Sequence, residues 1–498
     1  MTYDRVMWTS VSGLTFVGLL LIIDVCMASA EWQGDLSAYE LASFHNPDQE
    51  DVPRAQTFNH FTLSDHGDVY VGAVNWLYRF NSRLEQIQNA STCDDSMPYN
   101  GMPCRRTNNY NKILVVDSTR PNSLITCGGV FDGICQLRHL RDISIVESES
   151  TPNVAGFEDA TTVSLIGPKR DSNKMLYVAV TYTGENVISK AQFPAITRRN
   201  LTSNPILSVL LHNAVFLSGA ASGVDFTIKY VTTFDFTGFT YFIASHKEDL
   251  MSAHYVSKIS RVCQTGPNLD AYTEITMQCS GSDGSVYSLV QAAHFGPAGP
   301  DLAASWGLHA DKQVLYAVFA KNQGAQGTSH IPTDHSAVCV YRMTDILAGF
   351  TEAVRGCIQD GEDYKISYLH GSTCSKFRNV QPDNFLCNPV ADDTNSLYKY
   401  AKGITPVSST ALLEEPGTLM SSIITSTEFN HTVAFLGTSR GALLKVHIEN
   451  NTAARLYERV ILDSRPVLTD MTINDTTTEM HVLTEQTLIK MRAENCGQ

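Results

Sequence analysis

Apolar and polar residues along the chain repeat one unit: a short apolar strand, a small or polar turn, and a second strand in which apolar positions alternate. Seven segments carry this pattern: 68–80, 123–137, 175–193, 240–263, 314–343, 432–448 and 479–492. Their spacing is uneven, so they share a pattern rather than a sequence. Repeated hairpins of this kind are typical of a β-propeller, in which each blade buries its faces only against its neighbours.

The pattern therefore predicts an all-β fold, a seven-bladed β-propeller. Stacked β-sandwich domains are the alternative, and the lack of Pro/Gly-rich linkers between the units disfavours them. The alternating stretch 57–63 is predicted to complete the last blade, so that the ring has no open edge. The longest gap, 344–431, is polar and has little apolar periodicity. Its cysteines predict a loop insertion pinned by disulfides.

The first thirty residues have the layout of a secretory signal. Arg5 precedes an apolar stretch from Val11 to Ile23, and "ASA" at 28–30 is a small-residue cleavage site. An uncleaved anchor is disfavoured, because Asp24 interrupts the apolar run short of the roughly 20 residues that a spanning helix needs. We expect a signal peptide at 1–30, a lead-in at 31–54, entry into the secretory pathway and no membrane span in this chain.

Cysteines and sequons agree with that compartment. Of 12 cysteines, Cys26 leaves with the signal, and an odd number remains in the mature chain, which predicts disulfides and one unpaired thiol. Five N-x-S/T sequons predict N-glycosylation. Their asparagines are Asn89, Asn200, Asn430, Asn450 and Asn474. The net charge is −15 and basic residues do not cluster, so nucleic acid is not an expected partner.

Candidate catalytic and metal motifs are weak. "CGGVFDGIC" at 127–135 is followed by no G-K-[ST], so it does not predict a phosphate-binding loop. The histidine pairs His330/His335 and His246/His254 have neither the helical context nor the cysteine partners of a zinc site. Acidic pairs at 94–95 and 392–393 have no second pair placed opposite them. We expect no enzyme activity, no cofactor and no metal.

Five runs carry a family resemblance, among them "NKILVVDSTRPNSLITCGGVFDGICQL" at 111–137. The others are 69–80, 286–324, 431–448 and 466–498. In order and spacing they resemble the sema domain of plexins, the cell-surface receptors for semaphorins. The resemblance covers about residue 55 to the end and implies a sema β-propeller at 55–493. "ENCGQ" at 494–498 resembles the start of the plexin-semaphorin-integrin module, so we expect the sequence to stop inside that module.

The resemblance also implies how the cysteines pair, which their spacing alone leaves open. The implied pairs are Cys93–Cys104, Cys127–Cys135, Cys263–Cys387, Cys279–Cys339 and Cys357–Cys374. Cys496 is then left unpaired.

For function, the resemblance implies the extracellular ligand-binding head of a plexin-like receptor. It implies binding to semaphorin sema domains, with other plexin ectodomains as further partners, and a place at the plasma membrane within a full receptor. The family contact lies on the side of the ring near the third and fourth blades, here about 175–263. Charged candidates there are Glu185, Lys190, Arg198, Arg199, Lys247 and Glu248. Two alternatives stay open: a soluble ligand or decoy that occupies a semaphorin or plexin, and a secreted propeller hydrolase with acids converging in its channel.

Overall fold

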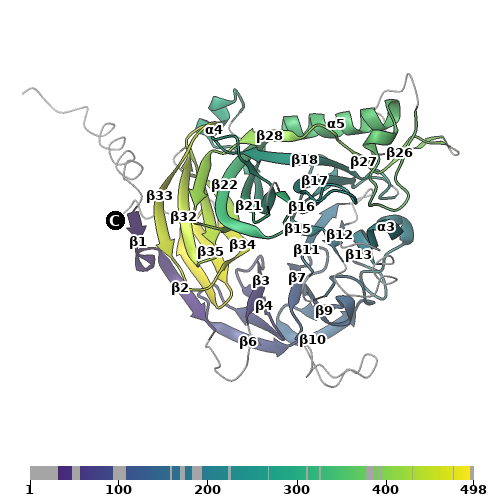
Figure 1. Ribbon diagram of the computed structural model, residues 1–498. Coiled ribbons are helices and arrows are strands. Elements are labelled where there is room, and N and C mark those ends of the chain that lie inside the picture. The colour runs from purple at the N-terminus through teal and green to yellow at the C-terminus, as the bar shows by residue number, and fades with distance from the viewer. Residues whose placement is uncertain are drawn as a thin grey trace, which may run out of the picture.

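The computed structural model describes residues 32–493 apart from short gaps. The gaps are 47–56, 93–107, 158–159, 169–173, 182–192, 223–225, 267, 310–311, 325–326, 377–385, 388–389, 393–394, 429 and 475. Within the described residues, seven sheets of four or more strands are arranged as the blades of a propeller. The colour runs once around the ring in Figure 1, and the purple strand β2 lies beside the yellow C-terminal blade.

The first three blades are antiparallel meanders whose innermost strand comes first in the chain. Blade 1 consists of β3 (Phe58–Leu63), β4 (Val69–Ala73), β5 (Trp76–Phe80) and β6 (Gln86–Ser91). Blade 2 consists of β7 (Asn111–Val116), β8 (Ser123–Gly128), β9 (Cys135–His139) and β10 (Asp142–Glu149). Blade 3 consists of β11 (Thr162–Pro168), β12 (Lys174–Val180), β13 (Pro194–Asn200) and β14 (Ala214–Phe216).

The next two blades follow the same plan, with additions from the long insertion. Blade 4 consists of β15 (Lys229–Phe236), β16 (Phe239–Lys247), β17 (Tyr255–Cys263), β18 (Thr273–Ser280) and β19 (Val286–Tyr287). Blade 5 consists of β20 (Leu289–Pro297), β21 (Gln313–Asn322), β22 (Pro332–Arg342) and β29 (Leu413–Pro416). Short helices lie in the connections: η1 (Leu36–Ala38), η3 (Val130–Asp132), η5 (Leu211–Asn213), α3 (Gly219–Ser222) and α4 (Pro300–Ser305).

The last two blades each take a strand from the N-terminal end of the described chain. Blade 6 consists of β30 (Met420–Glu428), β31 (His431–Thr438), β32 (Ala442–Ile448), β33 (Ala454–Ile461) and β1 (Trp32–Gly34). Blade 7 consists of β34 (Val467–Asn474), β35 (Glu479–Thr484), β36 (Thr487–Arg492) and β2 (Glu40–His45). β1 pairs parallel with β33, and β2 pairs antiparallel with β36.

Ring closure differs from the sequence prediction. The stretch 57–63 was predicted to complete the last blade, but it forms β3, the innermost strand of blade 1. β2 completes blade 7 instead, so part of the expected lead-in 31–54 belongs to the propeller. Alternation identifies a half-buried strand and says nothing about which strand it pairs with, which explains the error.

The seven predicted units fall on the second and third strands of the seven blades, one unit per blade. The third unit, 175–193, covers β12 but ends just before its partner β13. The repeat pattern therefore predicted the blade number and order correctly. These middle strands are buried on both faces, as in β12 and β31, because a neighbouring blade packs on each side.

The insertion 344–431 has more regular structure than its polar character predicted. It begins with helix α5 (Met343–Gln359), whose side chains Ile346, Phe350 and Val354 are buried. These residues lie at the i, i+4, i+8 spacing of a helix with one apolar face, a signal that the sequence reading missed. Figure 1 shows α5 on the outside of the ring, beside β18. The remaining pieces are η7 (Glu362–Tyr364), β23 (Thr373–Cys374), β24 (Val390–Asp392), β25 (Asn395–Ser396), β26 (Tyr398–Lys399), β27 (Ala401–Lys402) and β28 (Val407–Thr410).

Four disulfides are present among the described residues, and they are pairs that the family resemblance implies. They are Cys127–Cys135, Cys263–Cys387, Cys279–Cys339 and Cys357–Cys374. Cys279–Cys339 joins β18 of blade 4 to β22 of blade 5, and two others fasten the insertion. Cys93, Cys104 and Cys496 lie outside the described residues, so the first predicted pair and the unpaired thiol stay predictions.

A buried charged cluster anchors the N-terminal segment. The Tyr39 hydroxyl donates to both carboxylate oxygens of Glu458, at 2.6 and 2.5 Å. Lys445 lies 3.4 Å from the same carboxylate, and its ammonium sits 3.7 Å from the centre of the Tyr39 ring. All three side chains are almost fully buried. Burial, together with the Glu458 carboxylate, raises the pKa of Tyr39.

Replacing Tyr39 with phenylalanine removes the hydroxyl and leaves the buried Glu458 carboxylate with one partner fewer. We expect the free energy of unfolding, measured by urea denaturation, to fall by about 1–3 kcal/mol. Ser43→Ala, at an exposed position of β2, is the matched control and should change it by less than about 0.5 kcal/mol. Equal losses in the two variants would contradict a special role for the Tyr39–Glu458 contact.

Candidate functional site

The side of the ring formed by blades 3 and 4 is the surface that the sequence prediction singles out. Of its six predicted contact residues, Glu185 and Lys190 lie outside the described residues. Lys247 and Glu248 follow one another at the tip of the β16–β17 hairpin, half-buried and exposed respectively. The remaining two, Arg198 and Arg199, are neighbours in β13.

Arg198 is fully buried and joins the two blades. Its guanidinium donates to the carbonyl oxygen of Gly266 at 3.0 Å and to Oδ1 of Asn213 at 2.6 Å. Gly266 lies in the loop between β17 and β18 of blade 4, whereas Asn213 belongs to η5 of blade 3. Leu269 of the same loop also donates its N–H to the carbonyl of His212, at 3.0 Å. Arg198 is thus a structural residue at the seam between blades 3 and 4.

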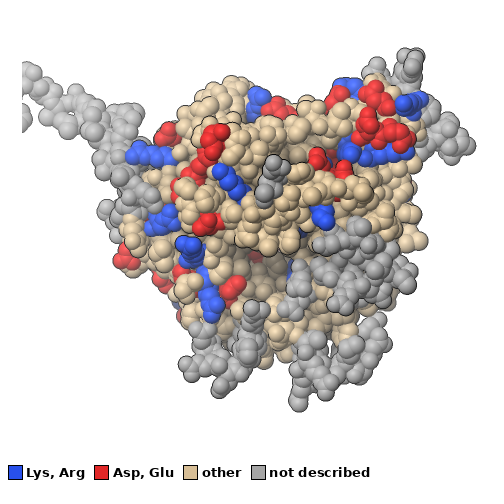
Figure 2. Space-filling view, in the orientation of Figure 1, with Lys and Arg blue, Asp and Glu red and all other residues tan. Residues whose placement is uncertain are grey.

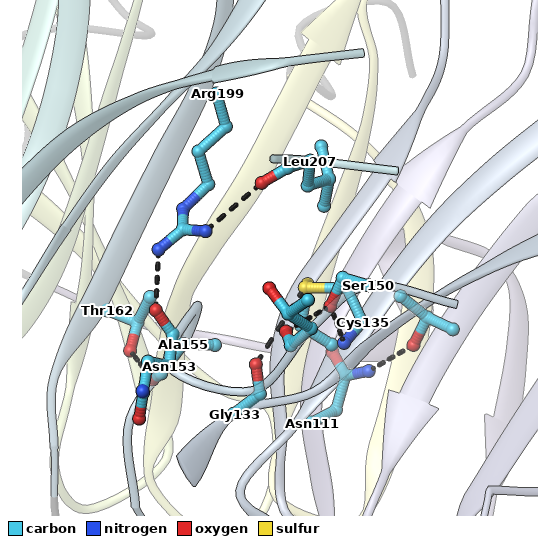
Figure 3. Close-up of a disulfide and its surroundings, with 12 residues drawn as sticks. Asn111, Gly133, Cys135, Ser150, Asn153, Ala155, Thr162, Arg199 and Leu207 are labelled. Carbon is cyan, nitrogen blue, oxygen red and sulfur yellow. Dashed lines mark hydrogen bonds between the residues drawn. A yellow bond between two sulfur atoms is a disulfide. The ribbon is translucent and has the colours of Figure 1, made fainter. Parts of the chain in front are cut away.

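Arg199 is buried on the other side of the same strand. Its guanidinium donates to Oγ1 of Thr197 at 2.9 Å and to the carbonyl oxygens of Leu207 and Asn153. Figure 3 shows the bonds to Leu207 and Asn153. Burial lowers the pKa of Arg199 to about 9. Asn153 precedes blade 3 in the chain, so Arg199 fastens the connection from blade 2 to blade 3.

The prediction that Arg198 and Arg199 contact a ligand is therefore wrong for this structure. Successive side chains of a strand point to opposite faces, so a strand with one exposed face would leave one of the two arginines accessible. Here the blade 4 loop covers one face and the connection from blade 2 covers the other.

Truncating Arg198 to alanine leaves Asn213 and the Gly266 carbonyl without their donor and opens a void at the seam. We expect the free energy of unfolding to fall by about 2–4 kcal/mol, measured by chemical denaturation. Glu248→Ala, at the exposed hairpin tip, should change it by less than about 0.5 kcal/mol. If Arg198→Ala were as stable as the parent, the seam would not depend on this residue.

An exposed apolar pair lies next to this seam. Leu210 and Leu211 are 62% and 82% exposed. Leu210 directly precedes the turn η5 and Leu211 begins it, and η5 leads into the outermost strand of blade 3, β14. The sequence reading missed them, because a run such as "VLLHNAVF" at 209–216 reads as one buried strand. The polar residues His212 and Asn213 interrupt this apolar run, and they were the available signal that it is not one continuous buried strand.

The predicted glycosylation positions are accessible in every case. Asn450 is half-exposed, and Asn89, Asn200, Asn430 and Asn474 are exposed. Asn200 ends β13, and its N–H donates to the carbonyl of Ser208 at 3.1 Å. Because Ser208 lies two residues before Leu210, a glycan on Asn200 would border the exposed leucine pair.

His246 is not predicted from the sequence to be a metal ligand. In the structure it lies in a buried polar cluster of blade 4. Its ring Nε2 is 3.4 Å from the hydroxyl of Tyr368, and that hydroxyl donates to Glu274. Glu274 also pairs with Lys258 at 3.4 Å. Burial lowers the pKa of His246 to about 4, although Glu274 acts in the opposite direction. His246 is therefore a neutral core histidine at physiological pH.

The low pKa of His246 makes stability depend on pH. The folded value of about 4 lies below the ordinary 6.5, so the unfolded chain takes up the proton first as the pH falls. The contribution of neutral His246 is complete above about pH 6.5 and is lost progressively toward pH 4, with a limit of roughly 3 kcal/mol. Urea denaturation at pH 7.0, 5.5 and 4.5 should show this fall. His246→Gln should have a shallower pH slope than the parent, and identical slopes would contradict this assignment.

The central channel is lined by the innermost strands of all seven blades and has a volume of about 250 Å³. Asp470 is the one carboxylate in its described lining. It accepts from the N–H of Phe61 at 3.1 Å and pairs with His60 at 2.9 Å. Glycoside hydrolysis by the usual route needs two facing carboxyl groups. The described lining of the channel therefore does not support the propeller-hydrolase alternative.

Charged side chains are mixed on the face in Figure 2, with Lys and Arg scattered among Asp and Glu.

Among the described residues, one group of metal-type ligands comes together: Asp301, His431 and His447 at the junction of blades 5 and 6. The sequence reading missed this group, because its members come from three separate elements. None of the described helices is both long and apolar enough to cross a lipid bilayer.

A family model of the sema domain matches residues 290–474 of the chain. Plexin-A4 of Homo sapiens is 28% identical over 481 residues, which cover 89% of this chain and 25% of the relative. Plexin-A2 of Homo sapiens is 26% identical over 502 residues, which cover 92% of this chain and 25% of the relative. The chain thus spans about a quarter of the length of these curated relatives.

Solved structures agree on the fold. The extracellular region of plexin A4 superposes with a TM-score of 0.77 at 24% identity, over 92% of this chain and 47% of that one. Drosophila semaphorin 2a gives a TM-score of 0.61 at 15% identity, over 94% of this chain and 77% of that one. A structure of Drosophila plexin A in complex with semaphorin 1b gives a TM-score of 0.58 at 16% identity, over 94% of this chain and 89% of the matched one. Together, the family match over residues 290–474, the curated relatives and these superpositions show a sema-type β-propeller fold in a chain that is similar to the sema domains of plexins.

Proposed function

We propose that this chain is the extracellular ligand-binding head of a plexin-like receptor and that its ligand is the sema domain of a semaphorin. The observation that carries the proposal is the similarity to plexins over 89% of the chain. One of the solved structures that superpose on this chain is that of Drosophila plexin A in complex with semaphorin 1b. A rigid propeller suits a binding head, because it holds its loops and edges in constant positions.

The secretory pathway and the cell exterior are the compartment that we propose. Four disulfides and five accessible sequons support it, because disulfides persist in oxidising compartments. A signal peptide at 1–30 and the beginning of a plexin-semaphorin-integrin module at 494–498 belong to the same proposal.

For the contact surface, we propose the outer edge of blade 3 around Leu210 and Leu211. Exposed leucines beside a rigid seam can bury apolar area without a large cost in ordering. The Arg198 contacts and the Leu269–His212 bond hold the neighbouring turn in place. Lys247 and Glu248 lie at the opposite end of β16 from this seam, because Phe239 pairs with Cys263 at one end and Lys247 with Tyr255 at the other. A nine-residue strand spans roughly 27 Å, so we expect one ligand contact to centre on the leucines rather than on the hairpin tip.

The test is binding of the purified chain to a panel of semaphorin ectodomains by surface plasmon resonance. The parent should bind at least one member, and Leu211→Glu should weaken that binding by roughly tenfold or more, mainly through faster dissociation. Ile461→Glu, at an exposed apolar position of blade 6, is the matched control and should bind like the parent.

The outcomes separate the two parts of the proposal. A folded parent that binds no semaphorin in the panel contradicts the proposed function. A parent that binds but is unaffected by Leu211→Glu keeps the function and contradicts the proposed surface. Removal of the Asn200 glycan gives an independent check, because faster association is expected if that glycan borders the contact.

A further inference from the structure

Three metal-type ligands meet between blades 5 and 6. Asp301 lies in α4, which belongs to the connection from β20 to β21 of blade 5, whereas His431 begins β31 and His447 lies in β32 of blade 6. Oδ2 of Asp301 is 3.2 Å from Nδ1 of His431 and 3.0 Å from Nε2 of His447. The three ligand atoms all lie within 4.8 Å of one another.

The strand register brings the two histidines to the same side of the sheet. Val433 pairs with His447 in the antiparallel β31–β32 ladder, so His431, two residues before Val433, is a diagonal neighbour of His447 on one face. The two rings are 4.8 Å apart and nearly perpendicular. This position results from strand pairing and does not depend on a flexible loop.

The Asp301 carboxylate is oriented by bonds to its other oxygen. Oδ1 accepts from the N–H of Leu302 at 2.7 Å and from the N–H and hydroxyl of Thr432 at 3.2 and 3.3 Å. Thr432 is itself held by the N–H of Gly299, which donates to its Oγ1 at 3.0 Å. Such outer contacts orient the ligands in metal sites, and here they leave Oδ2 directed at the two histidines.

We propose that Asp301, His431 and His447 form a binding site for a divalent transition-metal ion, with Zn²⁺ as the best match. Two imidazoles and one carboxylate are a zinc-type ligand set, whereas Mg²⁺ and Ca²⁺ prefer oxygen ligands. Bonds of about 2.0–2.1 Å to zinc place tetrahedral ligand atoms roughly 3.3 Å apart. Two of the three separations already match that value, so a small rotation of the rings completes the set.

The site leaves a position open to solvent. The side chains of Asp301, His431 and His447 are 19%, 31% and 15% exposed, so a fourth ligand, from water or from a bound protein, can reach the ion. Because the ligands come from two blades, the ion would act as a clamp between blades 5 and 6. Metal that binds only the folded state raises the unfolding temperature.

The experiment is titration of the purified chain with Zn²⁺ by isothermal calorimetry, without a polyhistidine tag and after free thiols have been alkylated. We expect one ion bound per chain, a higher unfolding temperature with Zn²⁺ but not with Mg²⁺, and the visible absorption of tetrahedral cobalt when Co²⁺ replaces zinc. His447→Ala and Asp301→Asn should each weaken zinc binding by roughly tenfold or more.

His335→Ala is the matched control, because His335 pairs with Asp334 at 3.1 Å on the surface, and no third metal-type ligand joins them among the described residues. It should bind zinc like the parent. His431→Ala is informative as well, because it keeps the Asn430 sequon intact. Absence of saturable one-to-one binding by the parent, or equal binding by the parent and the Asp301 and His447 variants, would overturn the proposal. In that case the three residues form a metal-independent hydrogen-bonded contact between the blades.

Discussion

Closure of the ring is the constraint on which the rest of the structure depends. A propeller blade buries its faces only against its neighbours, so the first and last blades are stable only if the two ends of the chain meet. β2 pairs with β36 to complete blade 7, and β1 adds to blade 6. Tyr39 lies between these two strands and reaches the buried Glu458–Lys445 pair. A buried ion pair gains from further hydrogen bonds to its charged groups, and the closing segment supplies one.

Beyond ring closure, blades 4 and 5 are held by further contacts: a disulfide and the insertion that follows β22. The Cys279–Cys339 disulfide joins these blades, and the insertion packs α5 against them and adds strands β27 and β28 to blade 4. Arg198 then fixes blade 4 to blade 3 from inside the protein. This half of the ring is thus stiffened from several directions. A stiff surface lowers the cost of ordering on binding, which suits the proposed role of the blade 3 edge.

Burial in this structure does not follow residue type alone, and it reversed the prediction for Arg198 and Arg199. Arg198 and Arg199 are charged, and most arginines are exposed, yet both carry hydrogen bonds between segments inside the protein. Leu210 and Leu211 are apolar, and they lie on the surface. In both cases the neighbours come from other blades or connections, and a single sequence does not reveal which segments will cover a given strand. Helix α5 is a different case, because its apolar spacing was present in the sequence and was overlooked.

The family resemblance implied the pairing of the eight cysteines that the structure describes. The sequence by itself determined the local elements: seven strand-turn-strand units in order and an all-β fold. These properties follow from short-range alternation and turn residues, which are written along the chain. Only the tertiary structure decided which strand closes the ring, which charged residues are buried and which distant ligands meet. Asp301 and His447 are far apart in sequence and 3.0 Å apart in space, because the packing of blade 5 on blade 6 is a long-range property that no local pattern contains.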